Sequence, residues 1–255
     1  MLASRHYRLN RLKTLDLLNR LEAVDSQTIS IYLPPGLTES DIRGQVANAI
    51  PVQDIPAEML ERATSSATGA AVFWETSRGL LIQPPLPLAE RFISPDIDVE
   101  SLRSMLESTC TVALVLVRLG AFAIGVCRGE QLVASKTGTG LVHGRHRKGG
   151  SSQRRFERRR ENQARDFLER VCGHARQQLE PYVPDLSYLA YGGARTTIQA
   201  LKKQCPFLNQ FEDRTLPPLL DIHRPRRAVL EKAITDVWSS VITEWKDEEP
   251  AVQVA

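Results

Sequence analysis

Residues 111–136, TVALVLVRLGAFAIGVCRGEQLVASK, decide the fold of the second half of this chain. They contain three short runs rich in residues that favour β-strands. The runs are Thr111–Arg118, Ala121–Arg128 and Gln131–Lys136. Leu119-Gly120 and Gly129-Glu130 separate them, and two-residue connections that contain glycine are typical of tight hairpins. The stretch therefore predicts an antiparallel meander of three strands.

Downstream of the meander, apolar residues no longer alternate but recur every three or four residues. This spacing indicates a long helix from about Arg154. Pro181 and Pro184 end that pattern. Further elements alternate between strand and helix: a strand at Leu186–Tyr191 that ends in Gly192-Gly193, a helix at Arg195–Lys203, a strand at Leu219–Ile222 and a helix at Arg226–Trp245. The order βββαβαβα predicts an α/β domain with a ribonuclease-H-like mixed sheet.

Upstream of the meander the patterns predict a smaller α/β domain. Leucines at helical spacing indicate a helix near the N-terminus, and the alternative for this arginine-bearing stretch is a mitochondrial transit peptide. A strand at Thr28–Leu33 and a hairpin at Ala70–Trp74 and Gly79–Ile82 follow. Prolines between 84 and 95 mark a boundary. We expect domains at 1–95 and 96–247 and a flexible tail at 248–255.

The charge of the chain is concentrated in one segment. The net charge is +3, from 33 basic and 30 acidic residues. Residues 143–160, HGRHRKGGSSQRRFERRR, hold eight Lys/Arg and one acid, so this segment carries +7 and the remaining 25 basic and 29 acidic residues carry −4. Such a segment predicts binding to a polyanion, and RNA is the polyanion we expect.

The centre of this segment has the composition of a loop that enters a narrow RNA site. Gly149 and Gly150 permit positive φ and close approach of the backbone, and Ser151 and Ser152 follow. Gln153 offers an amide that orients a water without acting as a base. The cationic residues expected to bind phosphates are Arg145, Arg147, Lys148, Arg154, Arg155, Arg158 and Arg159.

Gly149 to Phe156, GGSSQRRF, resembles the catalytic loop and helix in the central domain of eukaryotic and archaeal class I peptide release factors, whose motif is Gly-Gly-Gln. The spacing is more similar to release-factor-like peptidyl-tRNA hydrolases of ribosome-associated quality control, in particular their bacterial branch. The resemblance covers about residues 80–245. It implies that Gln153 positions water or the terminal tRNA ribose in the peptidyl-transferase centre.

Departures from the release factors narrow the implied function. Stop-codon motifs are not recognisable in the first domain, and no third domain is expected after Trp245. The resemblance therefore implies codon-independent release of the nascent peptide from peptidyl-tRNA on a stalled ribosome or a split large subunit. Two alternatives remain open, namely cleavage of the tRNA 3′ CCA end by the same loop, and a non-catalytic protein that binds RNA or the ribosome.

Other site chemistries have weaker support in the sequence. The first two runs of the meander contain no Asp or Glu, so a two-metal nuclease site is not expected. The four cysteines form no C-x-x-C pair and are predicted to be buried thiols, which favours the cytoplasm. His143 and His146 lack further ligands for zinc. We expect a monomer with no cofactor, no bound metal and no membrane span.

Overall fold

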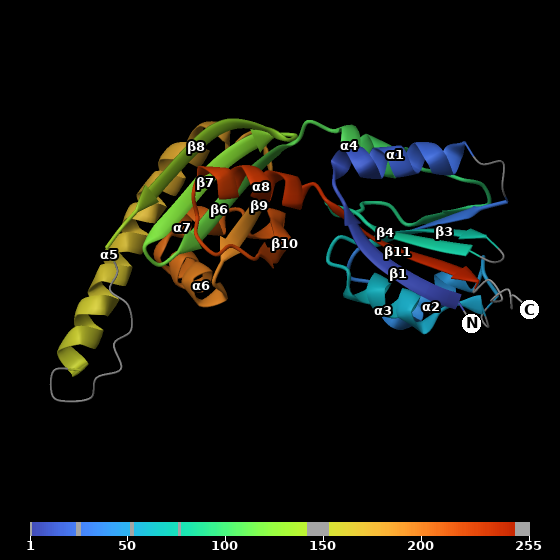
Figure 1. Cartoon of the computed structure of the whole chain (residues 1–255), viewed down its shortest axis with the longest axis horizontal. Coiled ribbons are helices and arrows are strands. Elements are labelled where there is room, and N and C mark those ends of the chain that lie inside the picture. The colour runs from blue at the N-terminus through green and yellow to red at the C-terminus, as the bar shows by residue number, and fades with distance from the viewer. Residues whose placement is uncertain (1, 24–26, 52–53, 76–77, 142–152, 248–255) are drawn as a thin grey trace, which may run out of the picture. The chain divides into compact units, whose positions relative to one another are not determined.

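The computed structural model describes residues 2–23, 27–51, 54–75, 78–141 and 153–247 (Figure 1). The chain forms two compact units. Unit 1 comprises Met1–Ser108 and Trp238–Ala255, and unit 2 comprises Thr109–Val237. Unit 1 therefore extends past the boundary expected at residue 95 and also contains the segment after residue 237. The expected tail, 248–255, lies outside the described residues.

Unit 1 is an antiparallel sheet with helices on both faces. Its elements are β1 (Leu2–Leu9), α1 (Arg11–Glu22), β2 (Ile29–Leu33), α2 (Glu39–Val46), α3 (Ala57–Ser65), β3 (Ala70–Glu75), β4 (Arg78–Gln83), β5 (Phe92–Ser94), α4 (Glu100–Glu107) and β11 (Ser240–Asp247). The strands lie in the order β1-β11-β4-β3-β2-β5. The predicted hairpin is present as β3 and β4, whose pairing includes Trp74 with Gly79.

Successive side chains along the strands of unit 1 point to opposite faces of the sheet, and this divides the core of the unit in two. Ile31, Val72 and Trp245 pack with residues of α2 and α3, and Tyr32, Phe73 and Ile242 pack with residues of α1 and α4. Figure 1 shows these two helix pairs on opposite faces of the sheet. Because both faces are covered, strands such as β2 are buried along nearly their whole length.

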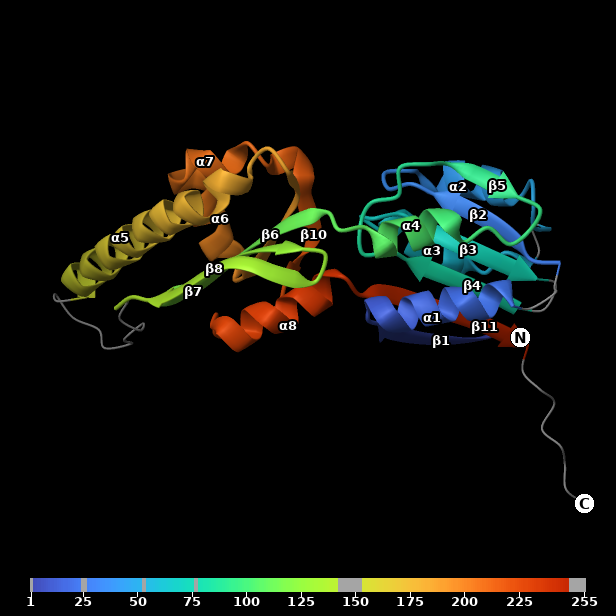
Figure 2. The same ribbon diagram turned by 90° about the horizontal axis from the view of Figure 1, so that it is seen from above.

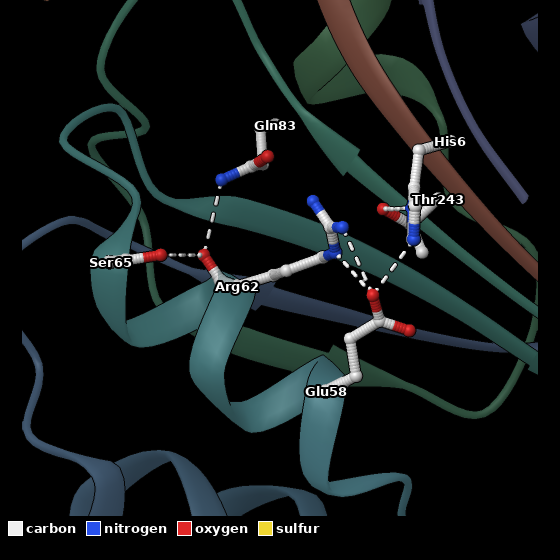
Figure 3. Close-up of polar contacts among 6 residues, drawn as sticks. All are labelled: His6, Glu58, Arg62, Ser65, Gln83 and Thr243. Atoms are coloured by element: carbon white, nitrogen blue, oxygen red, sulfur yellow. Dashed lines mark hydrogen bonds and ion pairs between the residues drawn. The ribbon is translucent and has the colours of Figure 1, made fainter. Parts of the chain in front are cut away.

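A polar cluster ties α3 to the strands at the edge of this sheet (Figure 3). His6 Nε2 lies 2.8 Å from Glu58 Oε1, and His6 Nδ1 lies 3.2 Å from Thr243 Oγ1. Arg62 donates to the same Glu58 oxygen at 3.0 Å. Burial opposes ionisation of Glu58, but hydrogen bonds from Arg62 and Ser4 and the nearby positive charges outweigh it and hold the pKa of this carboxyl below its usual value.

Unit 2 contains the predicted order βββαβαβα. Its elements are β6 (Thr111–Arg118), β7 (Ala121–Arg128), β8 (Gln131–Thr139), α5 (Gln153–Leu179), η2 (Glu180–Tyr182), β9 (Leu186–Gly193), α6 (Arg195–Gln204), α7 (Pro206–Asn209), η3 (Glu212–Arg214), β10 (Thr215–Leu220) and α8 (Arg227–Val237). The strand order is β10-β9-β6-β7-β8. Strands β6, β7 and β8 form the antiparallel meander, whereas β9 pairs parallel with β6 and β10 parallel with β9. The mixed α/β sheet is confirmed.

Helices cover both faces of the sheet in unit 2. Val115, Ile124 and their neighbours on one face form a core with Phe167, Val171 and Ala175 of α5 and with residues of α6. Helix α8 packs on the other face, where a Cβ on Gly125 would lie 2.9 Å from Leu230 Cδ2. Figure 2 shows α5 and α8 on opposite sides of the strands.

The predicted end of the last helix is wrong. The last helix ends at Val237, and residues 240–247 form strand β11 between β1 and β4. Val237, Val241 and Trp245 fit a helical spacing of four, but positions 241 and 245 fit the strand period of two equally well. The helix expected near the N-terminus is present as α1, where Asn10 caps it by accepting from the Lys13 amide, and residues 2–9 before it form β1.

The prediction of four buried thiols is also wrong. Cys172 on α5 and Cys205 after α6 form a disulfide, with their Cα atoms 5.5 Å apart. Their sequence separation of 33 gave no indication that the two helices would bring them together. Cys127 is the buried thiol that the sequence suggested, and burial raises its pKa to about 12. Cys110 is half-buried and not disulfide-bonded.

Gly193, at the end of β9, occupies a conformation and a space that exclude any side chain. Its φ is +121°, and a Cβ would lie 2.0 Å from the Val117 carbonyl oxygen. We expect Gly193→Ala to destabilise unit 2 by about 3 kcal/mol or more, since strain and a backbone clash combine. Gly36→Ala is the control, because its φ is +85° and no atom lies within 4 Å. It should cost about 1–2 kcal/mol. Denaturant unfolding measures both, and equal losses would contradict the role of the clash.

Candidate nucleic-acid interface

Helix α5 is longer than the sheet that it covers. It has 27 residues, and the helical rise makes it about 40 Å long. Its first buried residue is Phe167, and none of the side chains described between Arg155 and Asp166 is buried. We call residues 153–166 the basic stalk. Figure 1 shows the start of α5 extending away from the strands of unit 2. The stalk therefore presents Gln153 about 20 Å from the first packed turn.

The basic stalk is electrostatically unfavourable as an isolated helix. Its first turn has no acidic residue, and Arg154 and Arg155 stand at the end where the helix dipole is positive. Arginines also repel each other at a spacing of four, as between Arg155 and Arg159. Each effect costs a few tenths of a kcal/mol to about 1 kcal/mol, and a bound polyanion would remove that cost.

The structure places three predicted phosphate-binding residues together on this stalk. Arg155, Arg158 and Arg159 are exposed and lie within two turns of one helix. Within the part of the chain that is described, no carboxylate forms an ion pair with any of them. Gln153 begins the helix. The predicted residues Arg145, Arg147, Lys148, Gly149, Gly150, Ser151 and Ser152 lie outside the described residues, as do His143 and His146.

Phe156 stands out among the residues of the stalk. It is 59% exposed among the stalk arginines, whereas Phe167, further along the same helix, is 1% exposed. An exposed aromatic ring beside arginines is suited to stacking on a nucleobase.

The last strand before residues 142–152, β8, ends at the edge of the sheet where β6 also ends. Strand β8 runs parallel to β6, because each pairs antiparallel with β7. The end of β8 therefore lies beside the end of β6, where the Gly140 amide donates to the Gly120 carbonyl at 3.0 Å. Phe167 and Arg170 of α5 contact the same point, since a Cβ on Gly140 would lie 2.6 Å from each side chain. The stalk begins beyond this edge.

Groups of three or more potential metal ligands are not found among the described residues. Carboxylates are also missing from β6 and β7, whose ends would have to hold them in a two-metal nuclease. In the same described residues no helix is both long enough and apolar enough to cross a membrane. The feature that the described residues present is thus an exposed cationic stalk that begins at Gln153.

A family model and curated relatives, compared by sequence, agree on one kind of protein. The family model described as Actinobacteria/chloroflexi VLRF1 release factor matches residues 110–243. Peptide chain release factor subunit 1 of Methanopyrus kandleri is 27% identical over an alignment 213 residues long, and the match covers 72% of this chain and 52% of that protein. The Saccharolobus solfataricus protein of the same name is 24% identical over an alignment 232 residues long, and the match covers 80% of this chain and 63% of that protein. The chain thus spans between about half and two thirds of the length of these relatives. The crystal structure of the archaeal translation termination factor aRF1 has 17% identity and a TM-score of 0.39, covering 90% of this chain and 73% of that chain.

Proposed function

The chain belongs to the Actinobacteria/chloroflexi VLRF1 release factor family, and we propose that it releases nascent peptides from peptidyl-tRNA by hydrolysis of the ester bond. The observation that carries this proposal is the basic stalk. An exposed cationic helix that projects beyond its sheet and begins at Gln153 can extend into an RNA-walled cavity. We place the site of action in the peptidyl-transferase centre of the large ribosomal subunit.

In this proposal, catalysis comes from the orientation of the reacting groups. The segment Gly149–Ser152 carries no group that serves as a general base at neutral pH, and the Gln153 amide both donates and accepts hydrogen bonds. Gln153 orders the attacking water or the terminal ribose, and ribosomal RNA completes the arrangement around the ester. The glycines let the backbone approach the tRNA end.

The charge of unit 1 supports release without codon recognition. Unit 1 carries 11 basic and 18 acidic residues, a net charge of −7, whereas unit 2 carries 22 basic and 12 acidic residues, a net charge of +10. A domain that reads messenger RNA would require a cationic surface to hold the phosphates. We therefore assign RNA contact to unit 2, and we propose that the protein acts as a cytoplasmic monomer on stalled ribosomes or split large subunits.

The test is incubation of the chain with large subunits that carry peptidyl-tRNA and no stop codon. We expect release of the peptide together with a tRNA whose 3′ end is an intact CCA sequence. Free peptide with a shortened tRNA would establish the tRNA-cleaving alternative and would overturn ester hydrolysis. Binding to the subunit without any release would leave only the non-catalytic alternative.

A further inference from the structure

We propose a second RNA-binding surface on unit 2, built from Arg118, Arg195, Arg224 and Arg226, which binds phosphodiester groups beside the stalk. We call these four residues the edge cluster. The inference rests on the proposed function, because it assigns a further contact with the RNA that the stalk enters.

Sheet topology gathers the edge cluster from three distant parts of the sequence. Strands β6, β9 and β10 run parallel, so their carboxyl ends lie at one edge of the sheet. Arg118 ends β6, Arg195 begins α6 directly after β9, and Arg224 and Arg226 follow β10. The end of β8 lies at this same edge. In open α/β sheets the carboxyl edge is where ligands bind.

Close contacts hold this edge together. The Arg118 Nε donates to the Ile222 carbonyl at 2.6 Å and so fixes the segment that carries Arg224 and Arg226 against β6. Gly192 allows the approach, because a Cβ there would lie 2.7 Å from Ile222 Cγ1. The segment after β10 is therefore packed against the sheet at the edge cluster.

The charges of the edge cluster face solvent. Arg195, Arg224 and Arg226 are exposed, and within the described part of the chain no carboxylate forms an ion pair with these three. Asp221 lies 3.7 Å from Arg118, and 84% of the Asp221 side chain is exposed. Arg227 is left out of the cluster, because Glu231 and Ser135 already bind its guanidinium.

The starts of α6 and α8 repeat the electrostatic feature of the stalk. Helices α6 and α8 each begin with an arginine and, like α5, have no acidic residue in the first turn. In unit 1, α2, α3 and α4 each have a carboxylate in the first turn. Helix α1 has none and begins with Arg11, but there the guanidinium donates to the Leu106 carbonyl. Cations at the positive end of a helix weaken it unless an anion is bound. Three such helices in a unit of net charge +10 indicate one extended polyanion.

The test compares two doubly neutralised variants of the full chain. Arg224→Gln/Arg226→Gln removes two charges from the edge cluster. Arg128→Gln/Lys203→Gln removes two charges at the opposite edge, because Arg128 ends the antiparallel strand β7 and Lys203 lies in the last turn of α6. Binding is measured across a salt series to two probes, namely an RNA minihelix that ends in CCA and large subunits without tRNA, and circular dichroism checks folding.

We expect the edge variant to bind on the order of tenfold more weakly at 0.1 M salt, with the slope of log K against log salt reduced by about 2. The control should bind like the wild type. A loss with the minihelix identifies tRNA phosphates, and a loss confined to subunits identifies ribosomal RNA. If both variants bound equally well, or were weakened equally, RNA binding by the edge cluster would be contradicted. The proposal of peptide release would not be affected by that result. A wild type that binds neither probe would instead contradict the proposed function.

Discussion

Replacing Gln153 by alanine should lower the rate of peptide release by about 10²- to 10³-fold, which is the effect of removing one well-placed hydrogen-bonding group from an active site. Gln153 occupies the start of α5, at the far end of the stalk. Its loss removes no charge, so the electrostatic contacts of the arginines remain. The expected result is therefore a variant that binds large subunits with unchanged affinity and releases almost no peptide in a single turnover.

Gln177→Ala is the matched control for this variant. Gln177 is exposed on the same helix, in the part that covers the sheet and far from the stalk. Its replacement should change neither binding nor release. Gln153→Glu separates orientation from acid–base chemistry, because a carboxylate loses the amide donor and gains a base. If release by Gln153→Glu exceeded that of the wild type, a missing base and not orientation would limit the reaction. Undiminished release by Gln153→Ala would remove Gln153 from the mechanism.

Much of unit 2 could be predicted because local patterns dominate it. The runs in 111–136 are separated by two residues each, and such separators leave little choice but hairpins. The apolar stripe from Phe167 onward sets the packed part of α5, and the glycines after Tyr191 set the end of β9. Each of these signals lies within a few residues of the structure that it determines.

Unit 1 shows where local patterns fail. Strand β11 pairs with β1, so that Tyr7 lies opposite Ile242 across more than 230 residues. The β-branched run around Ile242 becomes a strand because two edges, those of β1 and β4, are available on either side of it. Sequence spacing alone contains no information on those partners, and the helical reading of Val237, Val241 and Trp245 was equally regular.

The candidate site was predictable to the extent that it is contiguous. The arginines of the stalk stand close together in sequence, and their charge reveals them. The edge cluster could not be predicted in this way. Arg118, Arg195 and Arg224 are spread over more than 100 residues of the sequence, and only the parallel pairing of β6, β9 and β10 brings them to one edge. Exposure of Phe156 depends on where the sheet ends beneath α5, which is likewise a property of the folded unit.

Reversing two charges on the stalk should separate its function from its stability. In Arg155→Glu/Arg158→Glu the carboxylates stand in the first turns of α5, where the helix dipole favours negative charge. The same change removes the repulsion between Arg155 and Arg159. The free energy of unfolding should therefore stay equal or rise by about 0.3–1 kcal/mol per residue. Denaturant titration measures this change.

Binding should move in the opposite direction. The double reversal changes the charge of the stalk by four units, and two lost phosphate contacts become two repulsions, so affinity for large subunits should fall on the order of 10³-fold at low salt. Arg155→Gln/Arg158→Gln should lie between this variant and the wild type in both measurements. A structural role for the arginines predicts the reverse order, with reversal destabilising the protein and binding preserved. At the start of α2, by contrast, Glu39 and Asp41 match the positive end of the helix dipole. The arginines at the start of α5 lower the stability of the helix. Their presence is explained if this helix binds a polyanion.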